Sequence, residues 1–361
     1  MIEQNKIVVT GGSGQVGKSL QKIMPNATHL SSKDYNLTSE RDVAKMYYHL
    51  KPNCVVHLSA RVGGIIDNIN KPGEYFTDNV LMNTLLVEYA RFHNVERFIG
   101  VLSTCIYPDK VDKYPMTEDN LHMGPPTPTN FSYGYAKRSL AVQIDAYNKQ
   151  YKTKYQYLIP CNLYSENDKF GDNSHFVAAL IKKIHIAKIN GDNEITLFGT
   201  GTPLRQFMHS DDFAKVIKKC IDEDIYDNFN VSTEQNISIN DIAKIALKAC
   251  DAEYININYD NSKPDGQFRK DVSIEKMKSI ISDFEYTNLY DGIKSTYSIL
   301  EKKWKKSNNY NLIWFFDLCF VFFKKKENMK HKKITLVKDT IDKDDVDNLI
   351  EWLKTYPSFM L

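Results

Sequence analysis

The chain contains only six cysteines in 361 residues, and no two of them have the CxxC spacing of metal sites. Cysteines this sparse exclude a disulfide framework and indicate a reducing compartment. The sequence also lacks an apolar run of the roughly 20 residues that span a bilayer. Its first residues enter a strand pattern without a charged and then apolar leader. We therefore expect no signal peptide, no metal site and a cytoplasmic location.

Neither sign of charge is in large excess, since 47 Lys and Arg against 45 Asp and Glu give a net charge of +2. This balance gives no reason to expect a nucleic-acid partner. It hides a difference between residues 1–301, with 34 basic and 37 acidic residues, and residues 302–361, with 13 and 8. All three tryptophans fall in the second range. The shift in composition predicts a separate C-terminal extension.

A glycine loop lies close to the N-terminus. The run Lys6–Thr10 predicts a strand, the glycine loop follows directly, and Lys18–Met24 has a helical pattern. Glycines in this setting let the backbone approach a pyrophosphate at a helix N-terminus, where free N–H groups favour anions. A glycine turn without a ligand is the ordinary alternative. We predict that the cofactor lies on the loop and first helical turn, at Gly11, Gly14, Gln15, Val16 and Gly17.

The end of the next predicted strand, Thr28–Leu30, bears on which dinucleotide is bound. A site for NAD usually has a carboxylate there for the ribose 2′-hydroxyl. This chain has Ser31, Ser32 and Lys33 instead, which suit a 2′-phosphate. We therefore predict NADP, with Lys33 as a cofactor contact. Asp34 follows closely and argues for NAD.

Strand and helix patterns alternate four times before residue 102, which predicts βαβ units and a parallel sheet with right-handed crossovers. The expected fold class is α/β: a Rossmann-type doubly wound parallel sheet with a smaller α/β substrate-binding lobe. We place the nucleotide-binding domain at residues 1–162, with later returns to the sheet, the smaller lobe at 163–304 and the extension at 305–361. His57, inside an apolar run, is expected to be a core histidine. Ser210 is expected to cap a helix over 213–222.

Two stretches combine residue types that move protons. Ser103 and Cys105 follow an apolar run and would lie at the carboxyl end of a buried strand, where ligands bind in open α/β sheets. Tyr133 and Lys137 are four residues apart on one helix face, while Tyr135 faces elsewhere. A serine, a tyrosine and a lysine brought together can transfer a proton to a carbonyl oxygen.

These motifs resemble those of the extended short-chain dehydrogenase/reductase superfamily. More narrowly, the chain is similar to the GDP-L-fucose synthase family in Ser103–Lys110, Gly124–Pro126, Lys137–Arg138 and Ser262–Gly266. The resemblance covers the chain from about Lys6 to about Trp304. It implies NADPH-dependent 3,5-epimerisation and 4-reduction of GDP-4-keto-6-deoxy-D-mannose. It also implies a homodimer that forms through a helix bundle.

The resemblance also assigns catalytic roles. The C4 ketone acidifies the protons on C3 and C5, and inversion needs a base on one ring face and an acid on the other. By resemblance Cys105 is the base and His175 the acid, although a lone cysteine or histidine is more often structural. For the reduction, Tyr133 protonates the C4 oxygen while NADPH delivers hydride. Lys137 is expected to lower the tyrosine pKa and hold the nicotinamide ribose, and Ser103 to bind the developing oxyanion.

Further contacts are expected at strand ends and in the smaller lobe. The remaining cofactor contacts are expected at Ser59, Ala60, Lys137, Pro160, Asn162, Leu163 and His175. The substrate contacts are expected at Ser103, Asn162, Lys183, Phe198, Arg205 and Lys263. Arg205 and Lys263 suit the diphosphate of GDP because they are cations, and Phe198 stands where the family has an aromatic residue near the guanine. For Lys183 a surface ion pair is an equally ordinary role.

The extension carries two patterns of its own. Leu312–Phe323 is aromatic and is followed by three lysines, which would suit a membrane interface, a partner or the protein's own surface. Lys333–Asp342 and Asp345–Thr355 resemble the opening segment of a DegT-type sugar aminotransferase. By that resemblance the extension would be the start of a truncated or fused aminotransferase-like segment.

Two alternative functions stay open. An epimerase/reductase for a related GDP-4-keto-deoxy sugar, of the colitose type, would use the same residues. A non-catalytic NADP-binding regulator would keep the glycine loop but would not need Ser103, Tyr133 and Lys137 together. The chain also departs from the family pattern at Tyr164-Ser165-Glu166, where a Gly-Pro pair is usual.

Overall fold

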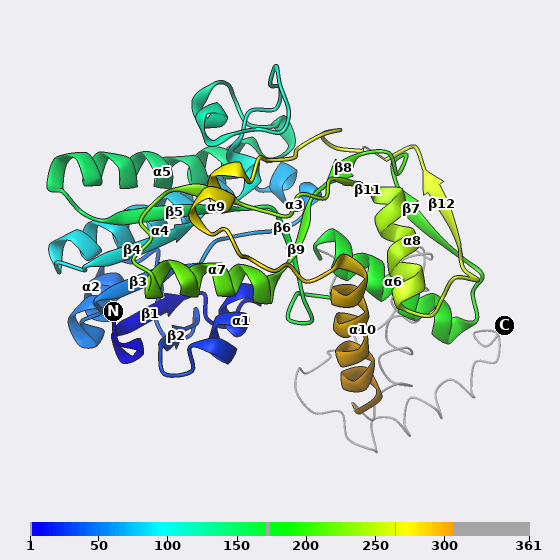
Figure 1. The fold of residues 1–361 in the computed structure, drawn as a ribbon, viewed down its shortest axis with the longest axis horizontal. Helices are drawn as coiled ribbons and strands as arrows, with labels where there is room; N and C mark the ends of the chain where they lie inside the picture. The colour runs from blue at the N-terminus through cyan, green and yellow to red at the C-terminus, as the bar shows by residue number, and fades with distance from the viewer. Residues whose placement is uncertain (1, 171–173, 264, 307–361) are drawn as a thin grey trace, which may run out of the picture. The chain divides into compact units, whose positions relative to one another are not determined.

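The computed structural model describes residues 2–170, 174–263 and 265–306. Met1–Lys303 form one compact unit, and Trp304–Leu361 form a second. Figure 1 shows the course of the chain, from blue at the N-terminus to orange in the last described helix. The aromatic segment and the aminotransferase-like segments of the extension lie outside the described residues.

The first unit contains a six-stranded parallel sheet in the order β10-β5-β4-β3-β1-β2. Its strands are β1 (Ile7–Thr10), β2 (Thr28–Leu30), β3 (Cys54–His57), β4 (Arg97–Val101), β5 (Tyr155–Pro160) and β10 (Phe229–Val231). Most of them are short apolar runs that are buried throughout, as strands covered on both faces must be. The predicted parallel sheet is confirmed, and β10 is one of the expected later returns to it.

Helices cover both faces of this sheet (Figure 1). On one face lie α2 (Glu40–Leu50), α4 (Pro72–Phe92) and α5 (Phe131–Tyr151), and α4 packs along α5. On the other face α1 (Gln15–Ile23) packs against α7 (Ser210–Asp222). Alternate residues of the central strands point into two separate buried cores, one on each face. Apolar area buried on both faces stabilises the sheet and fixes where its strands end.

The strand order changes direction beside β1. From β1 the chain adds β2 on one side and then crosses over to place β3 on the other. In open α/β sheets, ligands bind at the carboxyl ends of the strands at such a switch point. The glycine loop after β1 and the segment Ser59-Ala60 after β3 flank this position. The topology thus agrees with the predicted location of the cofactor.

Three two-stranded sheets follow later in the chain. They are the parallel pairs β6 (Asn162–Tyr164) with β9 (Phe207–His209) and β7 (Glu194–Phe198) with β12 (Asn256–Asp260), and the antiparallel pair β8 (Leu204–Arg205) with β11 (Ile237–Ser238). Helix α6 (Phe176–Asn190) packs on β7 and on α8 (Ile239–Ala249), and Figure 1 shows this group together. These elements belong to the range expected for the smaller lobe, whose boundary at residue 162 stays a prediction.

The remaining elements are short, except for the last. They are η1 (Gln4–Lys6), α3 (Ile65–Asn70), η2 (Thr104–Ile106), η3 (Glu118–His122), η4 (Pro128–Asn130), α9 (Glu275–Ile280) and α10 (Leu289–Lys306). Within residues 2–306, apart from the gaps given above, no helix is both long enough and apolar enough to cross a membrane.

One predicted helix cap is wrong. Helix α7 begins at Ser210 itself, and the capping residue is His209, whose Nδ1 accepts a hydrogen bond from Asp211 N at 3.2 Å. A neutral imidazole nitrogen can accept this bond as a hydroxyl would. Ser210 Oγ instead donates to Tyr164 O at 3.3 Å, which joins the start of α7 to the end of β6.

His57 is a buried core residue, as predicted. Its Nδ1 lies 2.9 Å from Thr10 Oγ1, and its Nε2 lies 3.0 Å from Asn83 Oδ1. Asn83 Nδ2 in turn donates to Ala136 O at 2.9 Å. Burial, together with the nearby Lys137 charge, lowers the pKa of His57 to about 3, so the ring is neutral. This chain of bonds ties β1, β3, α4 and α5 together.

Candidate active site

The residues after β4 form a tight turn at the carboxyl edge of the main sheet. Ser103 precedes the short helix η2, and its Oγ accepts a hydrogen bond from Cys105 N at 3.3 Å. Both side chains are half-buried. The turn therefore places Ser103 and Cys105 at the strand end where they were expected.

Helix α5 passes close to this turn because Gly134 has no side chain. A Cβ at that position would lie 2.7 Å from Cys105 O, which no real side chain could tolerate. Tyr133 and Lys137 lie on the buried face of α5, and Lys137 Nζ donates to Val101 O at 2.7 Å, at the end of β4. The structure thus brings the two predicted stretches together.

Tyr135 lies elsewhere, as its helical position predicts. Its ring packs edge-on against Phe131, with centroids 4.7 Å apart, and the Arg138 guanidinium lies 5.1 Å from its centre. Tyr135 is only half-buried, whereas Tyr133 is buried. Of the two tyrosines, Tyr133 is the one that lies beside Cys105.

Burial sets the protonation of Tyr133 and Lys137. It raises the pKa of Tyr133 well above 10, and the charge of Cys105 and the nearby Tyr75 add to this shift. It lowers the pKa of Lys137 to about 8. Burial is the largest cause of the raised Tyr133 pKa, and the expected lowering effect of the Lys137 charge stays a prediction. Tyr133 is held as a protonated hydroxyl.

Cys105 has a cationic partner that the sequence did not indicate. Lys270 Nζ lies 2.9 Å from Cys105 Sγ. Burial works to raise the pKa of the thiol, but the Lys270 charge and hydrogen bonds from Lys270, Ser103 and Asn130 outweigh it and lower the pKa below 9.0. A thiolate held by a cation is both a base and a nucleophile.

Lys270 reaches Cys105 because its segment runs beside the loop that follows η2. Met116 N donates to Asp271 O at 2.9 Å, and Ser273 N donates to Met116 O at 2.7 Å. Gln267 Nε2 also donates to Asp109 O at 2.8 Å. No local pattern in the sequence marks this pairing, because the two segments are about 160 residues apart along the chain.

His175 stands at the N-cap position of α6 and is held by an acidic partner. Its Nδ1 lies 2.9 Å and 3.1 Å from the two carboxylate oxygens of Asp168. This contact raises the pKa of His175, and the charge of Cys105 raises it further, although burial opposes both. The predicted base and acid are therefore close enough for their charges to interact. Asp168, like Lys270, was missed by sequence reasoning, although it lies only seven residues before His175.

The glycine loop is shaped to approach a ligand. Gly14 N donates to Gly11 O at 2.9 Å, and Gly17 packs so closely on the loop that a Cβ there would lie 2.4 Å from Gly11 O. Gly14 is the N-cap residue of α1 and offers no side chain to cap it, so the N–H groups of Gln15, Val16 and Gly17 face outward from the helix end. This cradle fits a pyrophosphate.

The other predicted cofactor contacts lie near the carboxyl edge of the same sheet. Ser59 and Ala60 follow β3, and Pro160, Asn162 and Leu163 end β5 and form β6. Asn162 Nδ2 donates to Gln206 O at 2.9 Å, so its amide also joins β6 to the segment between β8 and β9. Lys33 follows β2 and is exposed. Its neighbour Asp34 accepts hydrogen bonds from Ser31 N and Oγ, both at 2.7 Å, which lower the pKa of Asp34.

Two predicted substrate residues meet on α6 and β7. Lys183 Nζ donates to Thr196 O at 2.6 Å and lies 5.1 Å from the centre of the Phe198 ring. Phe198 is 63% exposed, so its ring is accessible to a ligand. A cation beside an exposed ring can stack on and pair with an aromatic, anionic ligand.

The two cations expected at the diphosphate have different surroundings. Burial lowers the pKa of Arg205, and the charges of Cys105 and Asp265 oppose this. Arg205 Nη1 donates to Leu204 O at 2.7 Å. Lys263 is exposed in the turn after β12, where its N–H donates to Asp260 O at 3.2 Å. The role of both as diphosphate contacts stays a prediction.

The NAD dependent epimerase/dehydratase family matches residues 7–232 of the chain. The chain is 35% identical over 303 residues to a GDP-L-fucose synthase of Dictyostelium discoideum, which covers 80% of this chain and 93% of that protein. It is 33% identical over 309 residues to a GDP-L-colitose synthase of Yersinia pseudotuberculosis, with coverage of 81% and 96%.

A solved structure agrees with these sequence matches. The crystal structure of a GDP-L-fucose synthetase from Naegleria fowleri bound to NADP superposes with a TM-score of 0.75 at 31% identity, over 83% of this chain and 93% of that one. The chain therefore belongs to the NAD dependent epimerase/dehydratase family and, within it, to the group that contains the GDP-L-fucose synthases.

Proposed function

We propose that this chain is a GDP-L-fucose synthase, which inverts C3 and C5 of GDP-4-keto-6-deoxy-D-mannose and then reduces C4. The observation that carries the proposal is the Lys270 ammonium 2.9 Å from Cys105 Sγ, at a thiol whose charge also acts on the pKa of His175 and of Tyr133. A simple reductase needs only the serine, tyrosine and lysine. The relatives named GDP-L-fucose synthase support the choice of sugar nucleotide.

The inversions need a base and an acid in charge states that most thiols and imidazoles do not hold at neutral pH. The Cys105 pKa is lowered below 9.0 and the His175 pKa is raised above 6.5, so both shifts enlarge the fraction of thiolate and imidazolium. Cys105 would take the proton from C3 or C5, and His175 would return a proton to the opposite ring face. Ser103 would hold the C4 oxygen while it carries negative charge.

The reduction needs a proton donor at the same oxygen. Tyr133, whose pKa is raised by burial, is protonated at neutral pH and would donate its proton to O4. Lys137 adds a positive charge on the same helix face and would bind a ribose hydroxyl. The cofactor we propose is NADPH, held by the glycine cradle, which when bound supplies the hydride for C4. Lys33 would contact its 2′-phosphate.

A colitose-type enzyme is the second candidate function. It is favoured by the GDP-L-colitose synthase of Yersinia pseudotuberculosis, which matches this chain about as well as the fucose synthases do. Such an enzyme acts on a 4-keto sugar without the C3 hydroxyl, so only C5 is inverted. The same five catalytic side chains would serve, and the difference between the two substrates is one hydroxyl group.

The test is to give the full chain NADPH with each 4-keto sugar nucleotide and to identify the product by NMR. The proposal predicts oxidation of NADPH with GDP-4-keto-6-deoxy-D-mannose and formation of GDP-L-fucose. Faster turnover of the 3-deoxy analogue, measured as kcat/KM, would favour the colitose-type function instead. If neither sugar is turned over, the enzymatic proposal is wrong and a regulator that binds NADP becomes the better hypothesis.

We also propose a cytoplasmic homodimer. Support for the dimer comes from α4 and α5, which pack along each other and still expose apolar side chains, including Leu81 and Val142. Support for the location comes from Cys54, Cys105, Cys161, Cys220 and Cys250, which are all free thiols. Light scattering during gel filtration tests the dimer: a monomer mass at micromolar concentration would contradict it.

A further inference from the structure

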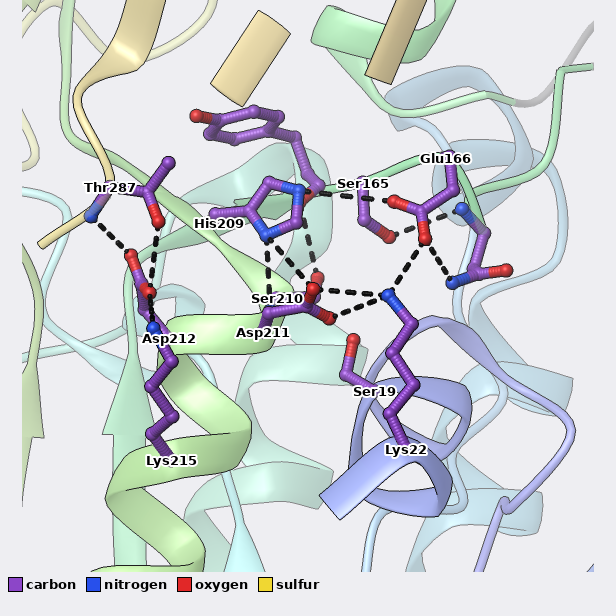
Figure 2. Close-up of polar contacts among 12 residues, drawn as sticks. Ser19, Lys22, Ser165, Glu166, His209, Ser210, Asp211, Asp212, Lys215 and Thr287 are labelled. Atoms are coloured by element: carbon purple, nitrogen blue, oxygen red, sulfur yellow. Dashed lines mark hydrogen bonds and ion pairs between the residues drawn. The ribbon is translucent and has the colours of Figure 1, made fainter. Parts of the chain in front are cut away.

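A network of charged side chains lies beside the candidate site and has no role in the chemistry proposed above. Lys22, on α1, bridges Glu166 and Asp211, with its Nζ 2.9 Å from Glu166 Oε1 and 3.0 Å from Asp211 Oδ2 (Figure 2). Burial works to raise the pKa of Glu166, but Lys22 outweighs it and the pKa is lowered, so the carboxylate is charged. A buried carboxylate is stable only with such partners.

Glu166 belongs to a short turn, Ser165–Asp168, that is fixed by its own hydrogen bonds. Asn167 N donates to Ser165 Oγ at 3.2 Å, and Asn167 Nδ2 donates to Glu166 Oε1 at 3.1 Å. Asp168 N donates to Ser165 O at 3.2 Å. Lys22 therefore joins the whole turn to α1 and, through Asp211, to the first turn of α7.

Asp168, the last residue of this turn, contacts His175, the predicted acid. The Asp168 side chain is only 4% exposed, and its carboxylate accepts from Lys169 N at 2.7 Å as well as contacting His175 Nδ1. The His175 side chain is 53% exposed. A ring this exposed would otherwise sample several rotamers, and holding it in one costs conformational entropy that the carboxylate contact offsets.

We propose that Ser165–Asp168 is a positioning element for His175: the Asp168 carboxylate orients the ring, and the Lys22–Glu166 ion pair holds the turn in place. The inference rests on the proposed function, since it assigns a purpose to His175 as an acid. With Nδ1 directed at Asp168, Nε2 is the nitrogen left to give a proton to the sugar. Delivery to one ring face requires a fixed donor.

The charges that face His175 come from three places. Asp168 and the charge of Cys105 favour the imidazolium, while Lys169 and burial oppose it. Without the Asp168 charge, Cys105 is the one group named above that still favours the imidazolium. The amide in Asp168→Asn can still accept the hydrogen bond from Nδ1, so this change tests the charge more than the packing.

The first experiment needs no substrate. The titration of His175 is followed by NMR of the ring, with its signal assigned by its loss in His175→Gln. We expect the titration midpoint to move to lower pH in Asp168→Asn and to return toward the wild-type value in Asp168→Glu. Asp283→Asn, at an 80% exposed carboxylate that lies near Lys219, is the matched control and should not move it. An unchanged midpoint in Asp168→Asn would overturn the proposal.

The second experiment measures exchange of deuterium from solvent into C3 and C5. At neutral pH Asp168→Asn should lower the exchange rate about 10- to 100-fold, which is less than the roughly 10²- to 10⁴-fold that a positioned general acid itself contributes, because His175 remains in place. The alkaline limb of the rate profile should move to lower pH, because less His175 is protonated there. A parallel loss at every pH, with the limb unmoved, would indicate a merely structural role and would contradict the proposal.

The ion pair is tested by a double-variant cycle. Lys22→Met and Glu166→Gln should each slow exchange about threefold to tenfold, and the double variant should be no slower than the worse single, because both changes remove the same Lys22–Glu166 ion pair. Lys215→Met is the control: Lys215 pairs with Asp212 at 2.9 Å on the same α7 and does not touch the turn (Figure 2). Additive losses, or an equal loss in Lys215→Met, would contradict the proposal.

These outcomes are distinguishable from a failure of the proposed function. If the wild-type chain shows no exchange and no reduction, the function is wrong whatever His175 does. If the wild type is active and the NMR midpoint is the same in wild type and Asp168→Asn, the function stands and the positioning element is wrong.

Discussion

The two pairs of proton-transfer residues are prepared in different ways. Cys105 and His175, the pair for inversion, each have a charged partner, Lys270 and Asp168, which moves the pKa in the direction that the chemistry needs. Tyr133 and Lys137, the pair for reduction, have no such partner among the described residues, and burial alone is the largest influence on both. Inversion is thus prepared by the protein's own charges, whereas reduction depends on a buried, neutral tyrosine.

The difference follows from the direction of each proton transfer. The base must give up its proton before the sugar arrives, so a thiol needs a cation nearby to ionise at neutral pH. The tyrosine must keep its proton until the ketone becomes an alcohol, and burial is sufficient for that. One site can therefore contain an ionised base and a protonated donor a short distance apart.

The largest expected effect is the loss of one activity, reduction or inversion, without loss of the other. Tyr133→Phe should abolish reduction, a loss of about 10²- to 10⁴-fold, because no proton donor remains at O4. Deuterium exchange at C3 and C5 should continue. Cys105→Ser should instead abolish deuterium exchange, since a serine hydroxyl does not ionise at neutral pH. NADPH oxidation and NMR of the recovered sugar measure the two activities.

Tyr135→Phe is the matched control for Tyr133→Phe. Tyr135 lies two residues away on the other side of α5, packed on Phe131 and Arg138. It should leave both activities within about twofold of wild type. If Tyr135→Phe stops reduction and Tyr133→Phe does not, the assignment of the donor is wrong.

A smaller effect is expected when the partner of Cys105 is removed. In Lys270→Met the pKa of Cys105 should rise, because the charge and the hydrogen bond of Lys270 no longer oppose burial. The base is active when deprotonated, so the acid limb of the exchange profile should move to higher pH. The rate at pH 7 should fall about tenfold for every whole pH step that the limb moves. Reduction of a sugar that needs no inversion should be unaffected. An acid limb at the wild-type pH would show that Lys270 does not tune Cys105.

The smallest effect concerns the buried, neutral His57, which forms hydrogen bonds with Thr10 and Asn83. The His57 pKa is about 3 in the folded protein and 6.5 for an ordinary histidine, so folding excludes a proton that the unfolded chain binds. Stability from His57 is full above pH 6.5 and is lost as the pH falls toward 3, by about 2 kcal/mol between pH 6.5 and pH 5. Urea unfolding at pH 7 and pH 5 measures this.

Two histidine variants make the assignment of this loss specific. His57→Gln cannot titrate and can still bond with Thr10 and Asn83, so its stability should depend less on pH over the same interval. His49→Gln, at an exposed histidine, should keep the wild-type dependence. If His57→Gln loses as much stability as wild type between pH 7 and pH 5, the acid sensitivity comes from other groups.

Local pattern was enough to predict the main sheet and the residues that come directly after its strands. The glycine loop, Ser103 and Cys105 each follow an apolar run, and strands of a parallel sheet end at a common edge. Helical spacing was enough to choose Tyr133 over Tyr135. These features depend on neighbours a few residues away, which a sequence displays directly.

The partners that tune the site could not be predicted in the same way. Lys270 contacts Cys105 across 165 positions of the chain, through a segment fixed by backbone bonds to Met116. The effect of burial on Tyr133 also depends on the whole core around it, so the raised pKa of its hydroxyl could not be predicted from local sequence. The predicted cap of α7 was wrong for a local reason: the imidazole of His209, and not the hydroxyl of Ser210, accepts the capping hydrogen bond.

Because Cys105 and Lys270 are 165 positions apart along the chain, the ribosome adds the cation long after the thiol. The last strand of the main sheet, β10, ends at Val231, and Lys270 leaves the ribosome only afterwards. The cation that lowers the pKa of Cys105 is therefore supplied only after every strand of the main sheet has been synthesised.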